Sequence, residues 1–211
     1  MPETNDIKSL IAEYARLTYR RGYLAGTEGN ISARDGGTVL ITASGVVKEF
    51  IAVTDIATIG MDGEPLEPTG PRPSTERYTH LEVYRARPDI AAVVHAHPRY
   101  VLLCNSLGIG LSEAPFTAEA AMFLSNVRTA PFARPSTSDG AGSLDGLLGD
   151  TNAVVLDRHG SLTFGKSVAE AFSVLEILEK HAMLTFLASL SSNKPRRFTD
   201  SELRALRNIP Y

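Results

Sequence analysis

The stretch Ile90-Ala91-Ala92-Val93-Val94-His95-Ala96-His97-Pro98 governs the interpretation of the whole chain. Small and β-branched residues dominate its first part, which is typical of a strand buried in a sheet. Residues i and i+2 of a strand share one face, so His95 and His97 direct two imidazoles to the same place. Because neutral imidazole nitrogens bind Zn²⁺ and related divalent ions, the pair predicts a metal site at the end of this strand.

A second apolar segment ends in the same way. Ala153-Val154-Val155-Leu156 has the composition of a buried strand and is followed by Arg158-His159-Gly160, where we expect the glycine to permit a sharp turn. Two strand ends of one sheet can lie side by side, so His159 is a candidate third ligand. Catalytic zinc sites typically use three protein ligands and keep one position open.

The other histidines and the single cysteine are interpreted as structural. His80 and His181 fall within predicted helices. His80 follows Glu76 by four residues on the same helix face, so the alternative that His80 supports Glu76 is also open. Cys104 lies among aliphatic residues and is expected to be a small buried side chain. One cysteine cannot form an internal disulfide, which fits a reducing cytoplasm.

Length and composition limit the classes of function. The chain has 211 residues, 43% of them hydrophobic and 21% charged, with a formal net charge of −3. We therefore expect a single domain over residues 1–211 with one substantial core. The charge gives no indication of nucleic-acid binding. No apolar run approaches the roughly 20 residues that span a bilayer, and no signal peptide is recognisable, so we expect a cytoplasmic protein without a membrane partner.

Helix and strand patterns are interleaved without the regular rhythm of a parallel βαβ sheet. Spacing of apolar residues and capping signals predict helices at 5–21, 98–107, 117–124, 142–148 and 168–190, one from Ser74 or Thr75 to Arg87, and a short one opened by the capping box Thr199–Glu202. Strands are predicted at 39–42, 56–59, 90–97 and 153–156. The sequence therefore predicts an α/β domain whose central sheet is mixed or antiparallel and covered by helices.

Three loops combine small residues with polar donors. Pro73-Ser74-Thr75-Glu76 places two hydroxyls and a carboxylate at a predicted helix start, where free N–H groups and the helix dipole favour an anion such as phosphate. Plain helix capping is the alternative interpretation. Gly29-Asn30 and Thr42-Ala43-Ser44-Gly45 are two further loops in which a ligand can approach the backbone closely.

Taken in order, these segments resemble the class II aldolase/adducin family, and its L-fuculose-1-phosphate aldolases most of all. The resemblance extends over almost the whole chain. The matching segments are Gly29-Asn30-Ile31-Ser32, Ile41-Thr42-Ala43-Ser44-Gly45, Pro73-Ser74-Thr75-Glu76, His80-Leu81, Arg87-Pro88-Asp89, Val93-Val94-His95-Ala96-His97-Pro98 and His159-Gly160.

The resemblance implies an α/β/α fold with a mostly antiparallel sheet, and a ring-shaped homotetramer with active sites at subunit interfaces. It implies one zinc or other divalent ion per chain, and it makes Glu76 the acid/base. The implied metal ligands are His95, His97 and His159, and the implied phosphate cradle is formed by Asn30, Ser44, Gly45, Ser74 and Thr75.

The implied reaction is cleavage of a carbon–carbon bond in a phosphorylated ketose. Cleavage beside a carbonyl leaves an enediolate, whose negative charge a metal can stabilise as a Lewis acid. A carboxylate near the metal can move protons, and a bound phosphate holds the reacting carbons in position.

Two positions depart from the family pattern. The family's aldolases present a tyrosine from a neighbouring subunit shortly after the His-x-His motif, where this chain reads Ala114-Pro115-Phe116-Thr117. A second family tyrosine lies near the C-terminus, and Tyr211 is a loosely aligned counterpart and a candidate catalytic residue. The missing phenol affects the half of the aldolase reaction that handles the aldehyde.

Other reactions are known on the same scaffold. Decarboxylation of 3-oxo-tetronate 4-phosphates generates the same kind of enediolate from a different leaving group, and we rank it second after aldol cleavage. Pentulose-5-phosphate 4-epimerases resemble the segment Thr79–Arg85 but typically carry Asp where this chain has Glu76. The remaining alternatives are a methylthioribulose-phosphate dehydratase and a non-catalytic adducin-like interaction module, which has no need of three histidine ligands.

Overall fold

A computed structural model describes residues 4–111, 115–124 and 126–209. Within these ranges, seven strands form one sheet in the order β3-β2-β1-β4-β7-β6-β5. Neighbouring strands are antiparallel except β5 and β6, which run parallel. The predicted α/β fold with a mostly antiparallel sheet is therefore confirmed.

The elements alternate along the chain. The strands are β1 Asn30–Asp35, β2 Thr38–Thr42, β3 Ile56–Gly60, β4 Ala92–Ala96, β5 Arg128–Ala130, β6 Ala153–Leu156 and β7 Gly160–Gly165. The helices are α1 Thr4–Arg20, α2 Arg77–Ala86, α3 Arg99–Ser106, α4 Ala118–Phe123, α5 Ser138–Gly142, α6 Val168–Ser189 and α7 Asp200–Arg207, with 3-10 turns η1 Lys48–Phe50 and η2 Val53–Asp55.

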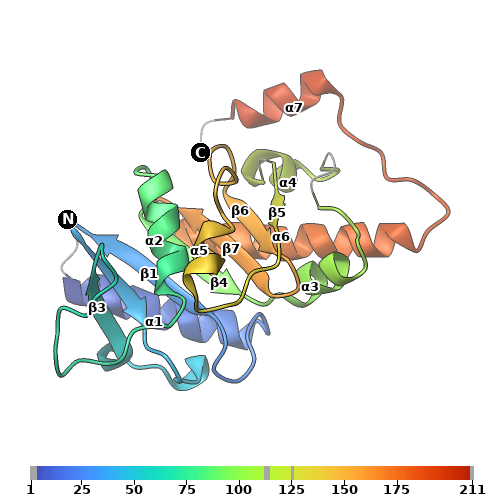
Figure 1. Ribbon diagram of the computed structural model, residues 1–211. Coiled ribbons are helices and arrows are strands. Elements are labelled where there is room, and N and C mark those ends of the chain that lie inside the picture. Colours follow the sequence, from blue (N-terminus) through green and yellow to red (C-terminus); the bar gives the residue numbers. More distant parts are fainter. Residues whose placement is uncertain (1–3, 112–114, 125, 210–211) are drawn as a thin grey trace.

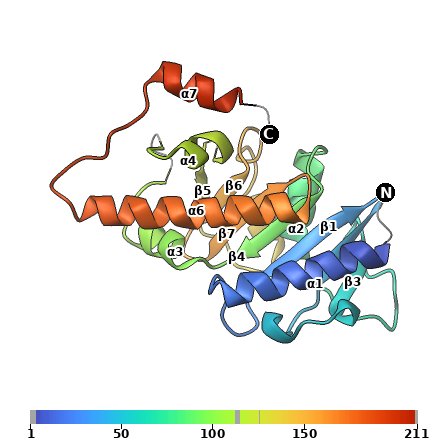
Figure 2. The ribbon, with the colours of Figure 1, turned by 180° about the vertical axis from the view of Figure 1, so that it is seen from behind.

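Helices cover both faces of the sheet. Val94 of β4 packs in a cluster with residues of α1 and α6, whereas its neighbour Val93 packs with Leu81 and Val83 of α2. Figure 1 shows α2 and α5 in front of the sheet, and Figure 2, from behind, shows α1 and α6 in front of it. Because alternate residues face opposite sides, the side chain of His95 lies on the same side as Val93, toward α2.

Most predicted elements are present with small differences in their ends. The helices α1, α3, α4, α6 and α7 and the strands β2, β3, β4 and β6 match predicted segments. The capping box between Thr199 and Glu202 is confirmed, since the side chain of each accepts from the backbone N–H of the other. Cys104 is buried, as expected, and its thiol donates to Ala182 O at 3.4 Å. No helix in the described ranges is both long and apolar enough to cross a bilayer.

Two predictions on helix position are wrong. The helix expected at 142–148 lies earlier, as α5, and turns follow it from 143 to 150. The helix expected directly after Ser74 or Thr75 begins at Arg77, with Glu76 at its N-cap position. Ser74 N–H donates to Thr42 O, and this bond holds the segment extended beside the end of β2.

Candidate metal centre

Three histidines meet where β4 ends and β7 begins. His95 belongs to β4, His97 follows this strand, and His159 directly precedes β7. The pairing of β4 with β7 brings His159 beside the other two. The candidate ligand nitrogens lie within 4.8 Å of one another, and the three pairs of ring centroids are 4.7 to 5.1 Å apart. The structure thus brings the three predicted ligands together in a geometry that can hold a metal ion.

The close approach of these strands depends on Gly160. A Cβ at this position would lie 2.5 Å from Ala96 O and 2.7 Å from a ring carbon of His97, distances at which the neighbours must shift. The residue with positive φ in this turn is Arg158, at 54°, rather than the glycine. Gly160 is therefore needed to leave space for the histidines, and the expectation that it makes the sharp turn is wrong.

Hydrogen bonds fix the protonation of two histidines. His95 Nδ1 lies 3.0 Å from Ser161 O, and His97 Nδ1 lies 2.9 Å from Glu28 Oε2. Both oxygens are acceptors, so each Nδ1 carries the proton, and in the neutral rings both Nε2 atoms have lone pairs. Burial lowers the pKa of His95 to about 4, although Glu76 opposes this, so His95 is neutral at pH 7.

The donor set fits a divalent cation. The two Nε2 atoms of His95 and His97 lie 3.1 Å apart, so when both rings are neutral two lone pairs face each other. A cation bound by both nitrogens relieves this conflict, and zinc is well suited to histidine nitrogens. His159 contributes the third imidazole, and burial lowers its pKa, which favours the neutral form that binds metals.

Glu76 faces the same point from the N-cap position of α2. Its Oε2 lies 3.3 Å from His95 Nε2, and its Oε1 lies 3.3 Å from His159 Nε2. Asn30 Nδ2 donates to Oε2 at 2.8 Å. Burial raises the pKa of Glu76, but its electrostatic interactions with His95 and His159 and the hydrogen bond from Asn30 outweigh this effect, so the pKa lies below its ordinary value. The ionised carboxylate is thus placed either to ligate a metal or to accept a proton beside it.

A buried chain of hydrogen bonds supports Glu76 from behind. Tyr84 OH and Ser32 Oγ are 2.7 Å apart, and Ser32 Oγ lies 2.7 Å from His80 Nδ1. His80 Nε2 bonds to Asn30 Oδ1, and Asn30 in turn donates to Glu76. Burial lowers the pKa of His80 to about 3, so it stays neutral, and with Ser32 donating to Nδ1 its proton lies on Nε2. His80 therefore orients the Asn30 amide with its NH₂ group toward the carboxylate.

The loops Thr42–Gly45 and Pro73–Glu76, both predicted to bind phosphate, lie side by side. Ser44 N–H donates to Arg72 O at 2.9 Å, and Ser74 N–H donates to Thr42 O at 3.1 Å. These bonds hold one loop against the other, and they occupy two N–H groups that an anion would otherwise contact. An anion at this place would therefore depend on hydroxyl groups and on the remaining backbone donors.

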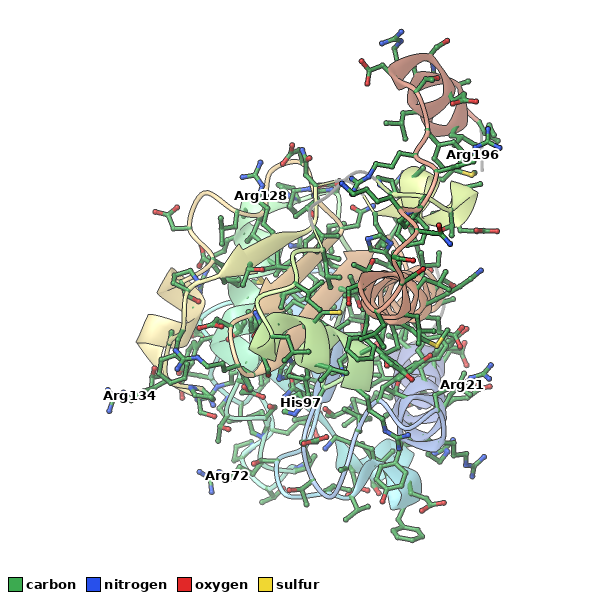
Figure 3. All side chains as sticks on the ribbon, turned by 90° about the vertical axis from the view of Figure 1, so that its right-hand side faces the viewer. Arg21, Arg72, His97, Arg128, Arg134 and Arg196 are labelled. Atoms are coloured by element: carbon green, nitrogen blue, oxygen red, sulfur yellow. The ribbon has the colours of Figure 1, made fainter. Side chains whose placement is uncertain are left out.

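Further members of the predicted phosphate cradle lie in different surroundings. The Oγ atoms of Thr75 and Ser136 are 2.7 Å apart. Gly45 has a φ of 78°, which favours glycine, and a Cβ there would meet no atom within 4 Å. Figure 3 shows His97 within the body of the molecule, whereas the arginines of these loop regions, Arg72 and Arg134, extend from its edge.

Two charged residues beside the centre were not identified from the sequence. Glu28 contacts His97, as described above, and Lys48 is almost completely buried nearby, donating to Thr27 O at 3.1 Å and Val46 O at 2.8 Å. Burial lowers the pKa of Lys48 to about 8, and Glu76 and Glu28 oppose this shift. No local pattern marks either residue, because their contacts arise only when distant segments fold together.

Of the two aromatic residues weighed for the aldolase reaction, only Phe116 is among the described residues, and it lies beside α6. Tyr211 and Ala114 lie outside the described residues. The ring of Phe116 lies 5.8 Å from that of His181 on α6, and His181 is buried apart from the metal centre, as expected for a structural histidine.

Comparison with known proteins gives a consistent result. The family model of the class II aldolase and adducin N-terminal domain matches residues 9–186 of this chain. A protein of Haemophilus influenzae named 3-oxo-tetronate 4-phosphate decarboxylase is 32% identical over 95% of this chain and 96% of its own. A Methanococcus maripaludis protein named L-fuculose phosphate aldolase is 30% identical over 82% of this chain and 92% of its own.

Solved structures agree with this result. The crystal structure of YgbL from Escherichia coli superposes on this chain with a TM-score of 0.88. YgbL is described as an aldolase, epimerase or decarboxylase, without a choice between the three activities. It is 31% identical in sequence and covers 97% of this chain and 99% of its own. From the family match over residues 9–186 and the relatives at 30% identity or more, we conclude that this chain belongs to the class II aldolase and adducin family.

Proposed function

We propose that this protein is a metal-dependent lyase that breaks a carbon–carbon bond beside a carbonyl in a small phosphorylated substrate. The convergence of His95, His97 and His159 with Glu76 is the observation that carries the proposal. Among the reactions open to this centre, decarboxylation of a 3-oxo-tetronate 4-phosphate has the strongest support. The relative that bears this activity in its name aligns with 95% of the chain.

The three histidines would hold one divalent ion, zinc or a related metal. When bound, the ion supplies a Lewis acid for the negative charge that develops on the carbonyl oxygen. Glu76 lies next to this position, and its carboxylate can take a proton from solvent and deliver it to the carbon that has lost CO₂. Asn30 holds the carboxylate in place, so its proposed role shifts from binding phosphate to orienting Glu76.

The second candidate is aldol cleavage of a phosphorylated ketose, which the sequence analysis ranked first. The L-fuculose phosphate aldolase relative supports it, at 30% identity. Two observations favour decarboxylation over it. The decarboxylase relative covers more of the chain, and the segment expected to supply the aldolase tyrosine contains Phe116 instead. Loss of CO₂ from a 3-oxo acid forms no aldehyde, so it has no hydroxyl from which a tyrosine would have to take a proton.

The substrate is proposed to bind between subunits of a homotetramer. Within the described part of one chain, the cavity bordered by Glu76 and His159 has a volume of only about 20 Å³, enough for one water molecule. A sugar phosphate needs more enclosure than this, which supports completion of the site by a neighbouring subunit. We propose that Ser44, Gly45, Ser74 and Thr75 contact the phosphate, and that Tyr211 remains a candidate for the neighbour's contribution.

Comparative turnover tests this proposal. We expect the zinc-loaded protein to release CO₂ from 3-oxo-tetronate 4-phosphate much faster than it cleaves L-fuculose 1-phosphate, and to act poorly on the unphosphorylated 3-oxo acid. Light scattering should give a mass of four chains. Efficient aldol cleavage without decarboxylation would reverse the ranking of the two reactions. A fully active monomer would disprove the proposal that subunits share the site.

A further inference from the structure

The partner of His97 is a carboxylate from the loop between α1 and β1. Glu28 Oε2 lies 2.9 Å from His97 Nδ1, and the two side chains are 32% and 16% exposed. An ionised carboxylate has no proton to donate, so the shared proton belongs to His97 Nδ1. This leaves the lone pair of Nε2 directed toward His95 and the proposed metal.

The two ligands of the His-x-His pair are supported by groups of different strength. Ser161 O, a neutral carbonyl, accepts from His95, whereas a charged carboxylate accepts from His97. A hydrogen bond to a charged acceptor is stronger than one to a neutral acceptor, and it makes the opposite ring nitrogen a better electron donor. His97 should therefore bind a cation more tightly than an unsupported imidazole would.

The loop that carries Glu28 is held firmly against β4. Ala25 N–H donates to Glu28 Oε1 at 2.6 Å, and His97 N–H donates to Tyr23 O at 2.9 Å. The next residue, Gly29, has a φ of 70°, and a Cβ there would lie 2.9 Å from His95 O. Glu28 thus reaches His97 from a segment that has little freedom to move.

Lys48 provides a buried positive charge beside the same loop. Its ammonium group donates to Thr27 O, adjacent to Glu28, and to Val46 O, and the residue is only 1% exposed. These bonds connect the Glu28 loop to the segment that follows β2. The cation also offsets the cost of placing carboxylates close together around the centre.

We infer that Glu28 is a positioning residue for the metal centre, which fixes His97 in the tautomer with a free Nε2 and thereby strengthens metal binding. The inference rests on the proposed function, because it takes the three histidines as the metal ligands. Partners of this kind typically change metal affinity by about 10- to 100-fold when they are removed.

Zinc affinity and the His97 tautomer measure this role separately. The metal-free wild type, Glu28→Ala, Glu28→Gln and Glu170→Ala are titrated with Zn²⁺ against a chromophoric chelator. Glu170 is the matched control, because its carboxylate also accepts a backbone N–H, from Lys166 at 2.8 Å, in an exposed position away from the histidines. Nitrogen NMR of the same metal-free proteins reports which His97 nitrogen carries the proton.

We expect Glu28→Ala to weaken zinc binding by about 10- to 100-fold, Glu28→Gln to weaken it less, and Glu170→Ala to leave it unchanged. The Nδ1–H tautomer of His97 should dominate in the wild type and decrease in Glu28→Ala. Unchanged affinity and tautomer in both Glu28 variants would overturn the inference, as would an equal loss in Glu170→Ala. If the wild type binds no zinc, the proposed function fails, and the tautomer measurement still decides the role of Glu28. Should Glu28→Ala not fold, Glu28→Gln decides both measurements.

Discussion

The histidine centre and the proposed phosphate loops differ in how their polar groups are used. At the centre, Ser161 O and Glu28 accept the Nδ1 protons and leave the Nε2 lone pairs of His95 and His97 unshared. In the loops, the N–H groups of Ser44 and Ser74 are bonded to the backbone. The first region therefore presents a ready set of ligand atoms, whereas the second presents few open donors. The structure is prepared for a cation more completely than for an anion.

Removal of one metal-binding histidine should have the largest effect on metal content and turnover. His95→Ala and His159→Ala each leave two imidazoles, and we expect both variants to lose stoichiometric zinc and measurable turnover. The fold should persist, because the sheet around the histidines is held by backbone pairing and apolar packing. Metal content by mass spectrometry and circular dichroism of the same samples measure the two effects.

His181→Ala is the matched control for loss of a buried histidine. His181 lies on α6 beside Phe116 and does not belong to the cluster, so its removal should leave metal content unchanged. Retention of stoichiometric zinc by both His95→Ala and His159→Ala would contradict the assignment of the ligands.

Glu76→Gln should separate metal binding from proton transfer. The amide keeps the shape of the side chain but cannot act as a base, so we expect turnover to fall by about 10² or more while zinc is retained. Metal content and steady-state turnover on the favoured substrate provide the measurement. Turnover near that of the wild type would exclude Glu76 as the proton-transfer group.

The sequence predicted the strand β4 but not its neighbours β1 and β7. The apolar residues of β4 give a clear pattern, whereas β1 and β7 alternate apolar residues with buried polar ones. In β7, Ser161 Oγ donates to Ala96 O and Thr163 Oγ1 donates to Ala171 O, so both hydroxyls are satisfied inside the protein. Their polar residues made these strands resemble exposed loops in the sequence, because the hydrogen bonds that satisfy these residues form only in the folded state.

The same limit applies to the candidate site. Its three histidines were identified as candidate ligands because each stands at a recognisable strand end, whereas the role of Glu76 was implied by the resemblance to the family. The partners that fix their protonation were not, since Glu28 is 69 residues and Ser161 is 66 residues from the histidine that it supports. The resemblance assigned Asn30 to phosphate, and only the fold reveals its bonds to His80 and Glu76.

A smaller effect is expected from Gly160→Ala. The added Cβ would lie 2.5 Å from Ala96 O, so β7 or the ring of His97 must move, and overpacking of this kind costs about 1–3 kcal/mol of the free energy of unfolding. Gly37→Ala is the control, since a Cβ there meets no atom within 4 Å. Urea unfolding of both variants tests the difference. Equal stability of the two would show that the approach of β7 to the histidines is less tight than described.

The pH dependence of stability should show the smallest effect, through His80. Its pKa is about 3 in the folded protein against an ordinary value of 6.5, because the buried ring stays neutral. As the pH falls below 6.5, the unfolded chain binds a proton that the folded protein refuses, so stability is lost progressively toward pH 3. One such group contributes at most about 1.4 kcal/mol per pH unit.

His80→Gln isolates this contribution, because an amide at this position can donate to Asn30 and accept from Ser32 but does not titrate between pH 7 and pH 5. Burial also lowers the pKa of His95 and His159, so the wild type and the variant should both lose stability in this range, with the smaller loss in the variant. Urea unfolding of the metal-free proteins at pH 7, 6 and 5 measures the two slopes. Identical slopes would mean that His80 takes up a proton as readily in the folded protein as in the unfolded chain. It would then not hold the fixed tautomer that orients Asn30 toward Glu76.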